Sequence, residues 1–433
     1  MDFAQQVKGQ VDIVRVVGDY VRLKKSGTDR WVGLCPFHSE KSPSFSVHAR
    51  LQIFKCFGCG KAGNSVKFLM EHEHLSYPEA LRLLAGKYSI EIEEEQTETF
   101  AQDQEEKESL FIINGFAQKF FHEQLMEEKE GRAIGLSYFK ERGFREDTIK
   151  KFGLGYSPEK EDAFAKAAVK AGYKEKLLQE LGLVQMRGRP VDFFRARVIF
   201  PIHNLSGKVI AFGARTLVKD KKVPKYLNSP ESSIYHKSKI LYGAYFAKNT
   251  IRSEDECLLV EGYTDVISLF QNGIENVVAS SGTSLTVDQI RLIKRYTPNI
   301  TILYDGDAAG VNAATRGLEL VLEQGLNVKI VVLPEGEDPD SFINNYGREK
   351  FEELIKQAQN FLEYQTEYYQ SQGMFDDPYK AAEAIRELVK PASLINDELK
   401  RNLLIKSIAK KFGLREMLLE TELNKFLKQH SRL

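Results

Sequence analysis

The chain of 433 residues is poor in cysteine, with four, and contains a single tryptophan. It has no apolar run long enough to span a membrane, and its N-terminus lacks the basic, apolar and small-residue order of a signal peptide. Three of the four cysteines lie in one cluster with a histidine, which favours a metal site in a reducing compartment over disulfides. We therefore expect a cytoplasmic, monomeric protein of two or three domains that makes no contact with a membrane.

The chain also lacks net charge, since 61 Lys and Arg balance 61 Asp and Glu. The charges are nevertheless unevenly distributed. Residues 1–70 contain 11 basic and 5 acidic side chains, residues 187–248 contain 13 and 3, and residues 89–109 contain 9 acids and one lysine. A neutral chain with two basic blocks can bind nucleic acid at those blocks, although a charged run by itself is equally typical of a solvated surface.

The acidic segment at residues 91–109 has little apolar periodicity and predicts a solvated, partly helical linker. Before it, the pattern predicts three short strands followed by two helices, at residues 29–35, 44–48, 52–56, 64–75 and 77–88. This order favours a small sheet with flanking helices.

After the acidic segment, residues 110–175 are predicted to be mostly helical, and residues 190–248 mix short strands with the loop PKYLNSPESS. From residue 256 four apolar runs alternate with amphipathic stretches: CLLV, NVVAS, ITILY and VKIVVLP. Such alternation is typical of βα units and a parallel sheet. Residues 348–433 are predicted to be helical, with a break at Pro391.

The cysteine cluster has the spacing of a metal site. It consists of the motifs CPFH and CFGC, with the candidate ligands Cys35, His38, Cys56 and Cys59. Two turns of this kind direct four ligands to one point and leave no open position, so they predict one structural zinc ion. The fourth cysteine, Cys257, is predicted to lie in the core, and three histidines without a spaced partner are predicted to lie on the surface: His48, His72 and His74.

Aromatic and basic residues alternate around the predicted ligands: Trp31, Phe37, Phe45, Phe54 and Phe57, with Arg30, Lys41, Lys55 and Lys61. Aromatic rings beside cations on a sheet bind single-stranded nucleic acid by stacking and charge neutralisation. In so small a domain most of the aromatic residues must also form the core. Both roles therefore stay open for each ring.

Three groups of acids follow three of the apolar runs: Glu261 and Asp265, Asp305 and Asp307, and Asp338 and Asp340. Because the carboxyl ends of parallel strands share one edge, we expect these side chains to converge. Hard oxygen ligands with small neighbours suit two or more Mg²⁺ or Mn²⁺ ions bound together with a phosphate. Carboxylates crowded together without a cation would repel one another.

We expect Glu261, Asp305 and Asp307 to be catalytic. The principal metal ligands would be Asp305, Asp307 and Asp338, with support from Asp340. Glu261 would bind metal or accept a proton, two roles that the sequence does not separate. Asp265 lies one helical turn further on and would orient the metal ligands without itself binding the metal.

The order of these acids resembles the Toprim domain, which type IA and type II topoisomerases, certain nucleases and bacterial primases share. The other motifs resemble those of bacterial DnaG-type primases, in that family's order: CPFHSEKSPSF, CFGCGKAGN, RVIFPI, PKYLNSPE, HKSKILYG, VEGYTDVISL, ASSGTSLT, YDGDAAG and PEGEDPDSF. The resemblance covers most of the chain up to the PEGEDPDSF motif. It implies a DNA primase, which is a DNA-directed RNA polymerase and nucleotidyltransferase that makes short RNA primers for replication.

The resemblance also implies a multi-domain α+β and α/β fold. Its parts would be an N-terminal zinc ribbon, a mixed α/β basic subdomain, a Toprim-like parallel-sheet subdomain and a C-terminal helical subdomain. We place the zinc-binding domain at 1–90, the acidic linker at 91–109, the N-terminal subdomain of the polymerase core at 110–250, the Toprim-like catalytic subdomain at 251–345 and the helical subdomain at 346–433.

Basic residues of the polymerase core would face the acids across a groove. By resemblance, the candidates for binding template, primer and triphosphate are Arg142, Arg195, Arg197, Arg215, Lys225, Asn228 and Lys237. Asn228 belongs to a turn with Ser229 and Pro230 that either presents backbone N–H groups to the substrate or is a plain surface turn.

The implied partners are a single-stranded DNA template, ribonucleoside triphosphates, the RNA primer and a replicative helicase. DnaG-type primases usually continue into a long helicase-binding domain, and we expect that domain to be absent from this chain, which would be truncated or an unusually short member.

Two other classes of function stay open. One is a Toprim nuclease or topoisomerase, although no motif identifies the nucleophilic tyrosine that a topoisomerase needs. The other is a non-catalytic zinc-ribbon binding module, which the six ordered acids disfavour.

Overall fold

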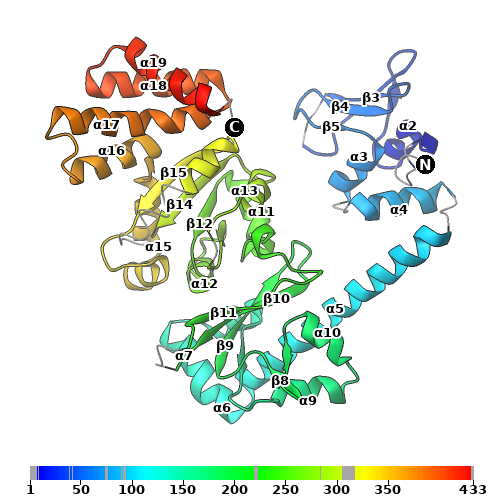
Figure 1. The fold of residues 1–433 in the computed structure, drawn as a ribbon. Coiled ribbons are helices and arrows are strands. Elements are labelled where there is room, and N and C mark those ends of the chain that lie inside the picture. The colour runs from blue at the N-terminus through cyan, green and yellow to red at the C-terminus, as the bar shows by residue number, and fades with distance from the viewer. Residues whose placement is uncertain are drawn as a thin grey trace. The chain divides into compact units, whose positions relative to one another are not determined.

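A computed structural model of the chain describes residues 7, 9–38, 40, 42–73, 77–88, 90, 94–218, 223–282, 284–304 and 317–430. The chain divides into two compact units, Met1–Glu106 and Lys107–Leu433. The boundary between them falls within the long helix α5 (Glu94–Met126), which is labelled in Figure 1. Among the described residues, no helix combines the length and the apolarity that a membrane span requires.

The first unit contains a five-stranded antiparallel sheet with the order β1-β2-β3-β4-β5. Its elements are β1 (Lys24–Lys25), β2 (Arg30–Gly33), β3 (Phe45–His48), β4 (Ile53–Cys56), β5 (Ala62–Gly63), α2 (Ile13–Gly18), α3 (Ser65–His72) and α4 (Tyr77–Lys87). Phe45, Phe54 and Phe68 are fully buried between the sheet and the helices. The predicted strands and helices of this region are therefore confirmed.

The second unit begins with helices around an antiparallel sheet of the order β11-β10-β9-β6 and a hairpin of β7 and β8. The strands are β6 (Gly155–Ser157), β7 (Val184–Met186), β8 (Pro190–Asp192), β9 (Arg197–His203), β10 (Val209–Thr216) and β11 (Tyr226–Asn228). The helices are α6 (Lys129–Gly131), η1 (Arg132–Leu136), α7 (Ser137–Glu141), α8 (Glu146–Phe152), α9 (Ala163–Lys170), α10 (Glu175–Glu180) and η2 (Lys237–Lys239).

Helix α5 differs from the predicted linker, because it is helical from Glu94 onwards. Glu, Gln, Ala and Lys are good helix formers, so a composition typical of a solvated segment is also compatible with a helix. From Leu110 onwards the helix has an apolar row at helical spacing, and these residues are buried: Leu110, Ile113, Ala117, Phe121 and Leu125.

The next sheet has the order β13-β12-β14-β15-β16. Its first four strands are parallel, and β16 is antiparallel to β15. The elements are β12 (Cys257–Val260), β13 (Val277–Ala279), β14 (Asn299–Tyr304), β15 (Asn327–Val332), β16 (Gln359–Asn360), α11 (Ala244–Glu254), α12 (Tyr263–Gln271), α13 (Val287–Lys294) and α15 (Pro339–Lys356). The four apolar runs are thus the four parallel strands, as the alternation predicted, and Cys257 is fully buried.

Helices form the C-terminal region: α16 (Phe361–Ser371), α17 (Pro378–Val389), η3 (Lys390–Leu394), α18 (Glu398–Phe412) and α19 (Glu416–His430). Asp377 begins α17 by accepting the N–H groups of Tyr379 and Lys380, each at 3.0 Å. The predicted break at Pro391 is the short helix η3. Residues of these helices, such as Leu388 and Ile408, share one core with Ile302 and Ile330 of the parallel sheet.

Candidate zinc centre and catalytic edge

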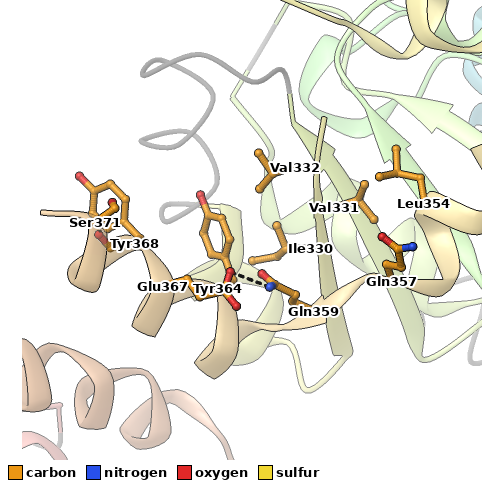
Figure 2. A pocket seen from close by; sticks show the side chains of 10 residues that line it. All are labelled: Ile330, Val331, Val332, Leu354, Gln357, Gln359, Tyr364, Glu367, Tyr368 and Ser371. Carbon is orange, nitrogen blue, oxygen red and sulfur yellow. Dashed lines mark hydrogen bonds between the residues drawn. The ribbon is translucent and has the colours of Figure 1, made fainter. Parts of the chain in front are cut away.

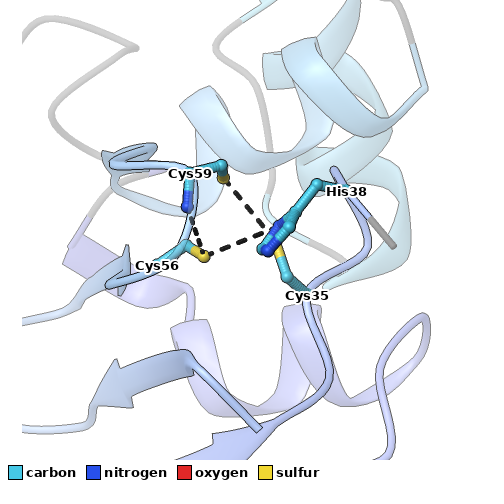
Figure 3. A group of neighbouring side chains, drawn as sticks. All are labelled: Cys35, His38, Cys56 and Cys59. Carbon is cyan, nitrogen blue, oxygen red and sulfur yellow. Dashed lines mark hydrogen bonds between the residues drawn. The ribbon is translucent and has the colours of Figure 1, made fainter. Parts of the chain in front are cut away.

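The four predicted zinc ligands lie together in the first unit (Figure 3). Their ligand atoms all lie within 4.8 Å of one another. Cys35 Sγ lies 3.8 Å from Cys59 Sγ, and His38 Nδ1 lies 3.8 Å from Cys56 Sγ. A tetrahedral zinc ion with Zn–S bonds of about 2.3 Å requires ligand atoms roughly this far apart. The donor set and its spacing therefore fit a structural zinc ion.

The turns around the cluster direct backbone N–H groups at the sulfur atoms. Cys56, at the end of β4, accepts from the N–H groups of Gly58 and Cys59 at 3.3 Å each. A Cβ atom at position 58 would lie 2.7 Å from His38 Nε2 and 2.9 Å from Ser44 Oγ. Glycine at this position therefore lets the second motif pack against the histidine ring without displacing it.

The thiols differ in how readily they ionise. Burial raises the pKa of Cys35 to about 12. At Cys56 burial acts in the same direction, but hydrogen bonds from the Ser44 hydroxyl and from backbone N–H groups outweigh it and lower the pKa to about 6. A thiolate at Cys35 therefore needs a cation beside it, which a bound zinc ion supplies.

Glu40 is a residue of this centre that the sequence interpretation missed. Its Oε2 atom lies 3.3 Å from His38 Nε2, and its Oε1 atom accepts the N–H of Cys35 at 2.7 Å. It also accepts the Ser44 hydroxyl, which together with backbone N–H groups lowers the pKa of the Glu40 carboxyl. The signal in the sequence was an acid two residues after a candidate histidine ligand, since ligating histidines usually donate their other N–H to a carboxylate.

The predicted aromatic residues of the zinc unit divide into two groups. Phe45 and Phe54 stack in the core with ring centroids 5.2 Å apart, whereas Phe57 is 63% exposed. Arg30 and Lys55 each lie 5.5 Å from the centre of the Phe57 ring. Together with Ser46, His48 and Ile53 they line a hollow of about 510 Å³ on the face of the sheet. Lys41 and His74 lie outside the described residues.

In the second unit the carboxylates follow strands that end at one edge of the parallel sheet. Glu261 comes directly after β12 and is exposed, and Asp338 follows β15 and caps α15 by accepting the N–H of Ser341 at 2.7 Å. Asp265 is buried and accepts the N–H of Gly262 at 2.8 Å, which fixes the turn after Glu261. Asp305 and Asp307 directly follow β14 in the sequence but lie outside the described residues.

Asp340 is 4% exposed, and both of its carboxylate oxygens have partners. Oδ2 forms an ion pair with Arg142, while Oδ1 accepts the Ser268 hydroxyl and, at 2.9 Å, Asn344 Nδ2. Burial raises the pKa of Asp340, although the Ser268 hydrogen bond and the Arg142 charge oppose that effect. Asp340 thus joins α15 to the N-terminal part of the unit.

Two of the residues predicted to bind nucleic acid or nucleotide, Asn228 and Lys237, lie near this edge. Asn228 Oδ1 accepts the Tyr263 hydroxyl at 2.7 Å, and Asn228 Nδ2 donates to Ser281 O at 3.3 Å. Lys237 Nζ lies 3.5 Å from Gly282 O, and the N–H of Ser281 donates to Glu261 O at 3.1 Å. The loop that follows β13 therefore connects Asn228 and Lys237 with the backbone of Glu261.

Arg215 and Lys225 belong to an aromatic cluster beside Arg142. The Arg215 guanidinium donates to the Tyr138 hydroxyl and lies 5.8 Å from the ring centre of Tyr226. Arg142 lies 5.5 Å from the Tyr138 ring, and exposed Lys225 lies 5.9 Å from the Tyr226 ring. Burial raises the pKa of Tyr138 to about 12, so this phenol stays neutral between the two arginines.

The remaining predicted residues have other contacts. Arg195 pairs with Glu161 at 2.9 Å. Arg197 is 6% exposed, and its guanidinium donates to Pro224 O at 3.0 Å and to Lys225 O at 3.4 Å. Ser229 is buried, and its hydroxyl accepts the N–H of Phe212 at 3.0 Å. The turn after Asn228 is therefore anchored to β10, and Arg197 supports the loop before it.

Tyr138, Tyr263 and Ser281 were also missed from the sequence. Tyr263 is 3% exposed and stacks on Phe200 with ring centroids 5.1 Å apart. Ser281 has a φ of 54°, which is uncommon for a residue other than glycine and occurs often at functional sites. For Tyr263 and Ser281 the available signal was their position within the motifs VEGYTD and ASSGTS.

A separate pocket of about 420 Å³ lies between β15 and α16 (Figure 2). Apolar side chains such as Ile330 and Leu354 line one side, and Gln359 donates to Glu367 at 2.8 Å on the other. None of the residues predicted from the sequence lines this pocket. It therefore contributes nothing to the catalytic edge.

Family models match four parts of the chain. The CHC2 zinc finger matches residues 1–100, the DNA primase catalytic core N-terminal domain matches 120–248, and a Toprim-like domain matches 258–343. These matches agree with the predicted zinc and divalent-metal chemistry. The nuclease, topoisomerase and binding-module interpretations have no comparable support.

A fourth model, the DnaB-helicase binding domain of primase, matches residues 362–416. The expectation that a helicase-binding domain is absent was therefore wrong. The matched helices, α16 to α18, carry no polar motif that marks them in the sequence, because their pattern is dictated by packing against the parallel sheet.

Similar proteins of known name agree with these matches. The DNA primase of Halalkalibacterium halodurans is 40% identical over 414 residues, which are 95% of this chain and 68% of that protein. The DNA primase of Clostridium acetobutylicum is 41% identical over 433 residues, covering 98% of this chain and 70% of that protein.

Two solved structures are similar as well. The zinc-binding and RNA polymerase domains of the Aquifex aeolicus primase match with a TM-score of 0.65 and 34% identity, over 97% of this chain and 99% of that one. A DnaG primase catalytic domain bound to ssDNA matches with a TM-score of 0.63 and 33% identity, over 71% of this chain and 99% of that one. With its zinc tetrad, its parallel-sheet edge and relatives of this identity, the chain belongs to the family of bacterial DNA primases.

Proposed function

We propose that the chain begins RNA primers on single-stranded DNA and that the carboxyl edge of the parallel sheet is where nucleotides are joined. The observation that carries this proposal is the meeting of acidic and basic groups there. Glu261 and Asp338 follow strands of that edge, Asn228 and Lys237 contact the Ser281 loop beside Glu261, and Arg142 pairs with Asp340.

The acids of this edge suit divalent cations. Glu261 and Asp338 offer hard oxygen atoms, and Asp305 and Asp307 are expected to add more because they directly follow β14 in the sequence. Bound Mg²⁺ or Mn²⁺ ions neutralise triphosphate charge and stabilise the attacking and departing oxygens of phosphoryl transfer. Both carboxylate oxygens of Asp340 already have partners, so we propose that Asp340 fixes the positions of Arg142 and α15 and does not bind a cation.

The chain's own groups position the nucleotides. The 3′ oxygen of one nucleotide attacks the α-phosphorus of the next, the bond to pyrophosphate breaks, and the 3′ hydroxyl proton leaves. Glu261 holds metal or accepts this proton. Arg142, Arg215, Lys225 and Lys237 bind phosphate groups of template, primer or triphosphate. Asp265 and Tyr263 act indirectly, by fixing the turn after Glu261 and the side chain of Asn228.

The zinc unit is proposed to read the template. Its sheet face presents Arg30, Lys55 and exposed Phe57 around one hollow, a combination that binds single strands by stacking and charge. The solved catalytic domain bound to ssDNA supports single-stranded DNA as the template. We further propose residues 1–90 as the template-reading domain and residues 110–250 and 251–345 as the polymerase core.

Recruitment would involve the C-terminal helices. The family match at residues 362–416 supports a replicative helicase as partner. The three clustered cysteines and the lack of a membrane-spanning helix among the described residues support a cytoplasmic location. We expect the chain to act there as a monomer.

An assay of labelled ribonucleotide incorporation on unprimed single-stranded DNA tests the proposal. A primase yields short RNA that requires template, all four ribonucleotides and Mg²⁺ or Mn²⁺. DNA cleavage or relaxation without RNA synthesis would assign the chain to the nuclease or topoisomerase class. Binding of DNA without either reaction would leave only a binding module.

A further inference from the structure

Helix α18 has one face that packs into the core and one that is exposed. Ile405, Ile408 and Ala409 are at most 3% exposed, whereas Leu399 is 69% and Leu403 is 55% exposed. The exposed residues recur at helical spacing and form one continuous strip: Leu399, Asn402, Leu403, Lys406, Ser407, Lys410 and Lys411. We call this strip the outer face of α18.

Further exposed apolar side chains follow the end of the helix. Gly413, with a φ of 67°, turns the chain towards α19. Leu414 is 36%, Met417 75% and Leu418 58% exposed on this turn and on the first turn of α19. Single exposed leucines are ordinary on protein surfaces, but five large apolar side chains on one helical hairpin are typical of an interaction surface.

The lysines give this surface a charge. Lys406, Lys410 and Lys411 are exposed, and in the described part of the chain none of them pairs with a carboxylate. Lysines in the last turn also favour the helix dipole, but Lys406 lies before that turn. A partner that covers Leu399 and Leu403 would place its own side chains beside these lysines. Charge complementarity therefore calls for an acidic, partly apolar partner.

Nucleic acid fits this face poorly. The outer face of α18 contains no aromatic side chain on which a base could stack and no arginine that could bind a phosphate with two hydrogen bonds, and exposed Arg415 beyond the helix is followed directly by the acidic Glu416. Its leucines would meet sugar and phosphate in such a complex. A protein surface with apolar side chains beside carboxylates could pack on the leucines of the strip and pair with its lysines.

We propose that the outer face of α18, with Leu414, Met417 and Leu418, docks an acidic and partly apolar face of the replicative helicase. This inference rests on the proposed helicase partner, because α18 lies within the residues that match the helicase-binding model. The inference goes further than the choice of partner, because it names the surface of this chain that makes the contact and the kind of side chains that the helicase must present there. Residues of the zinc centre and of the catalytic edge take no part.

The test measures the affinity of the full chain for the replicative helicase of its own organism by fluorescence anisotropy at low and high salt. Leu403→Glu should weaken binding by about tenfold or more, since it places a charge in the apolar part of the contact. Lys406→Glu combined with Lys410→Glu should weaken binding as strongly and remove its dependence on salt. Val169→Glu on α9 is the matched control, because Val169 is likewise 45% exposed, and its affinity should stay parental.

All variants should melt at the parental temperature and keep helicase-independent primer synthesis. If the parental chain does not bind the helicase, the proposed partner is wrong and this surface has no ligand. If the parental chain binds and both α18 variants bind within twofold of it, helicase binding stands and the docking surface is wrong. Loss of single-stranded DNA affinity in the lysine variant, with helicase affinity unchanged, would overturn the proposal in favour of a nucleic-acid surface.

Discussion

Glu40 Oε2 lies 3.3 Å from His38 Nε2, while the other ring nitrogen, Nδ1, lies 3.8 Å from Cys56 Sγ. The ring therefore presents Nδ1 to the zinc position while its other N–H is held by a carboxylate. Glu40 also accepts the backbone N–H groups of Cys35 and Ser44, at 2.7 and 3.0 Å. Glu40 thus joins the first ligand motif to Ser44, whose hydroxyl lies 3.2 Å from Cys56 Sγ in the second motif.

Replacing Glu40 by Gln should lower zinc affinity about 10- to 100-fold, because the histidine loses its negative partner while the amide keeps part of the hydrogen bonding. The measurement is competition for zinc with a chromophoric chelator. Glu73→Gln is a control, since Glu73 bonds His72 outside the tetrad. An affinity of the Glu40 variant equal to that of the control would show that Glu40 does not support the ligand.

Cys59→Ser should separate two activities. Structural zinc contributes on the order of 10 kcal/mol to folding a small domain, so losing a ligand should unfold the zinc unit, whereas Lys107–Leu433 has its own cores. Initiation without a primer should nearly vanish, while extension of a pre-annealed primer at high concentration persists. Equal loss of both activities, with normal melting of the second unit, would mean that the zinc unit takes part in catalysis.

Lys225 and Arg197 should respond differently to removal, although both are basic residues of one block. Lys225 is exposed, so Lys225→Ala should flatten the plot of log affinity for single-stranded DNA against log salt by about 0.7. Arg197 is buried on the carbonyls of Pro224 and Lys225, so Arg197→Ala should leave the slope nearly parental.

Loss of Arg197 should instead cost about 1–3 kcal/mol of stability, because a buried side chain is removed and the carbonyl of Pro224 loses a charged hydrogen-bond donor. Thermal unfolding of both variants checks this difference. A flattened salt slope together with parental stability for Arg197→Ala would place its guanidinium on the nucleic acid.

Asp192 should make the stability of the second unit depend on pH. Burial raises the pKa of Asp192 to about 6, although its carboxylate accepts the N–H groups of Phe164 and Ala165 at 2.8 Å each. The folded state therefore binds this proton more tightly than the unfolded state, and the stabilisation present below about pH 4 is lost as the pH rises through about 6.

The Asp192→Asn variant lacks this titration. The unfolding free energy of the parental chain should therefore fall relative to that of the variant between about pH 4 and 6, by an amount on the order of 3 kcal/mol or less. Chemical denaturation across this range measures the difference. A difference that stays constant with pH would show that Asp192 ionises normally in the folded chain.

The parallel sheet and the zinc site could be predicted from the sequence because each has a local signature. The four apolar runs are short, and amphipathic segments separate them along the chain. The spacing of the three cysteines and His38 is that of four ligands around one tetrahedral metal ion. Acids that follow strands could likewise be assigned to one edge: Glu261 stands directly after β12, and Asp338 lies between β15 and α15.

What could not be predicted depends on contacts between distant residues. The sequence gives no sign that Arg197 is buried on backbone carbonyls or that Arg142 pairs with Asp340, which is 198 residues away. Helices α16 to α18 resemble any packed helices, so their relation to helicase binding became visible only by comparison. The acidic segment was ambiguous because its residue types suit both a solvated coil and the helix α5.

The carboxyl edge of the parallel sheet is proposed to join nucleotides. Unprimed RNA synthesis on single-stranded DNA with Glu261→Gln and Asp338→Asn measures whether its acids are needed. Both variants should lose about 10³-fold or more of the activity at ordinary Mg²⁺ concentration while melting at or above the parental temperature, because removing a carboxylate from a crowded metal site relieves repulsion. RNA synthesis at the parental rate by both folded variants would show that nucleotides are joined elsewhere in the chain.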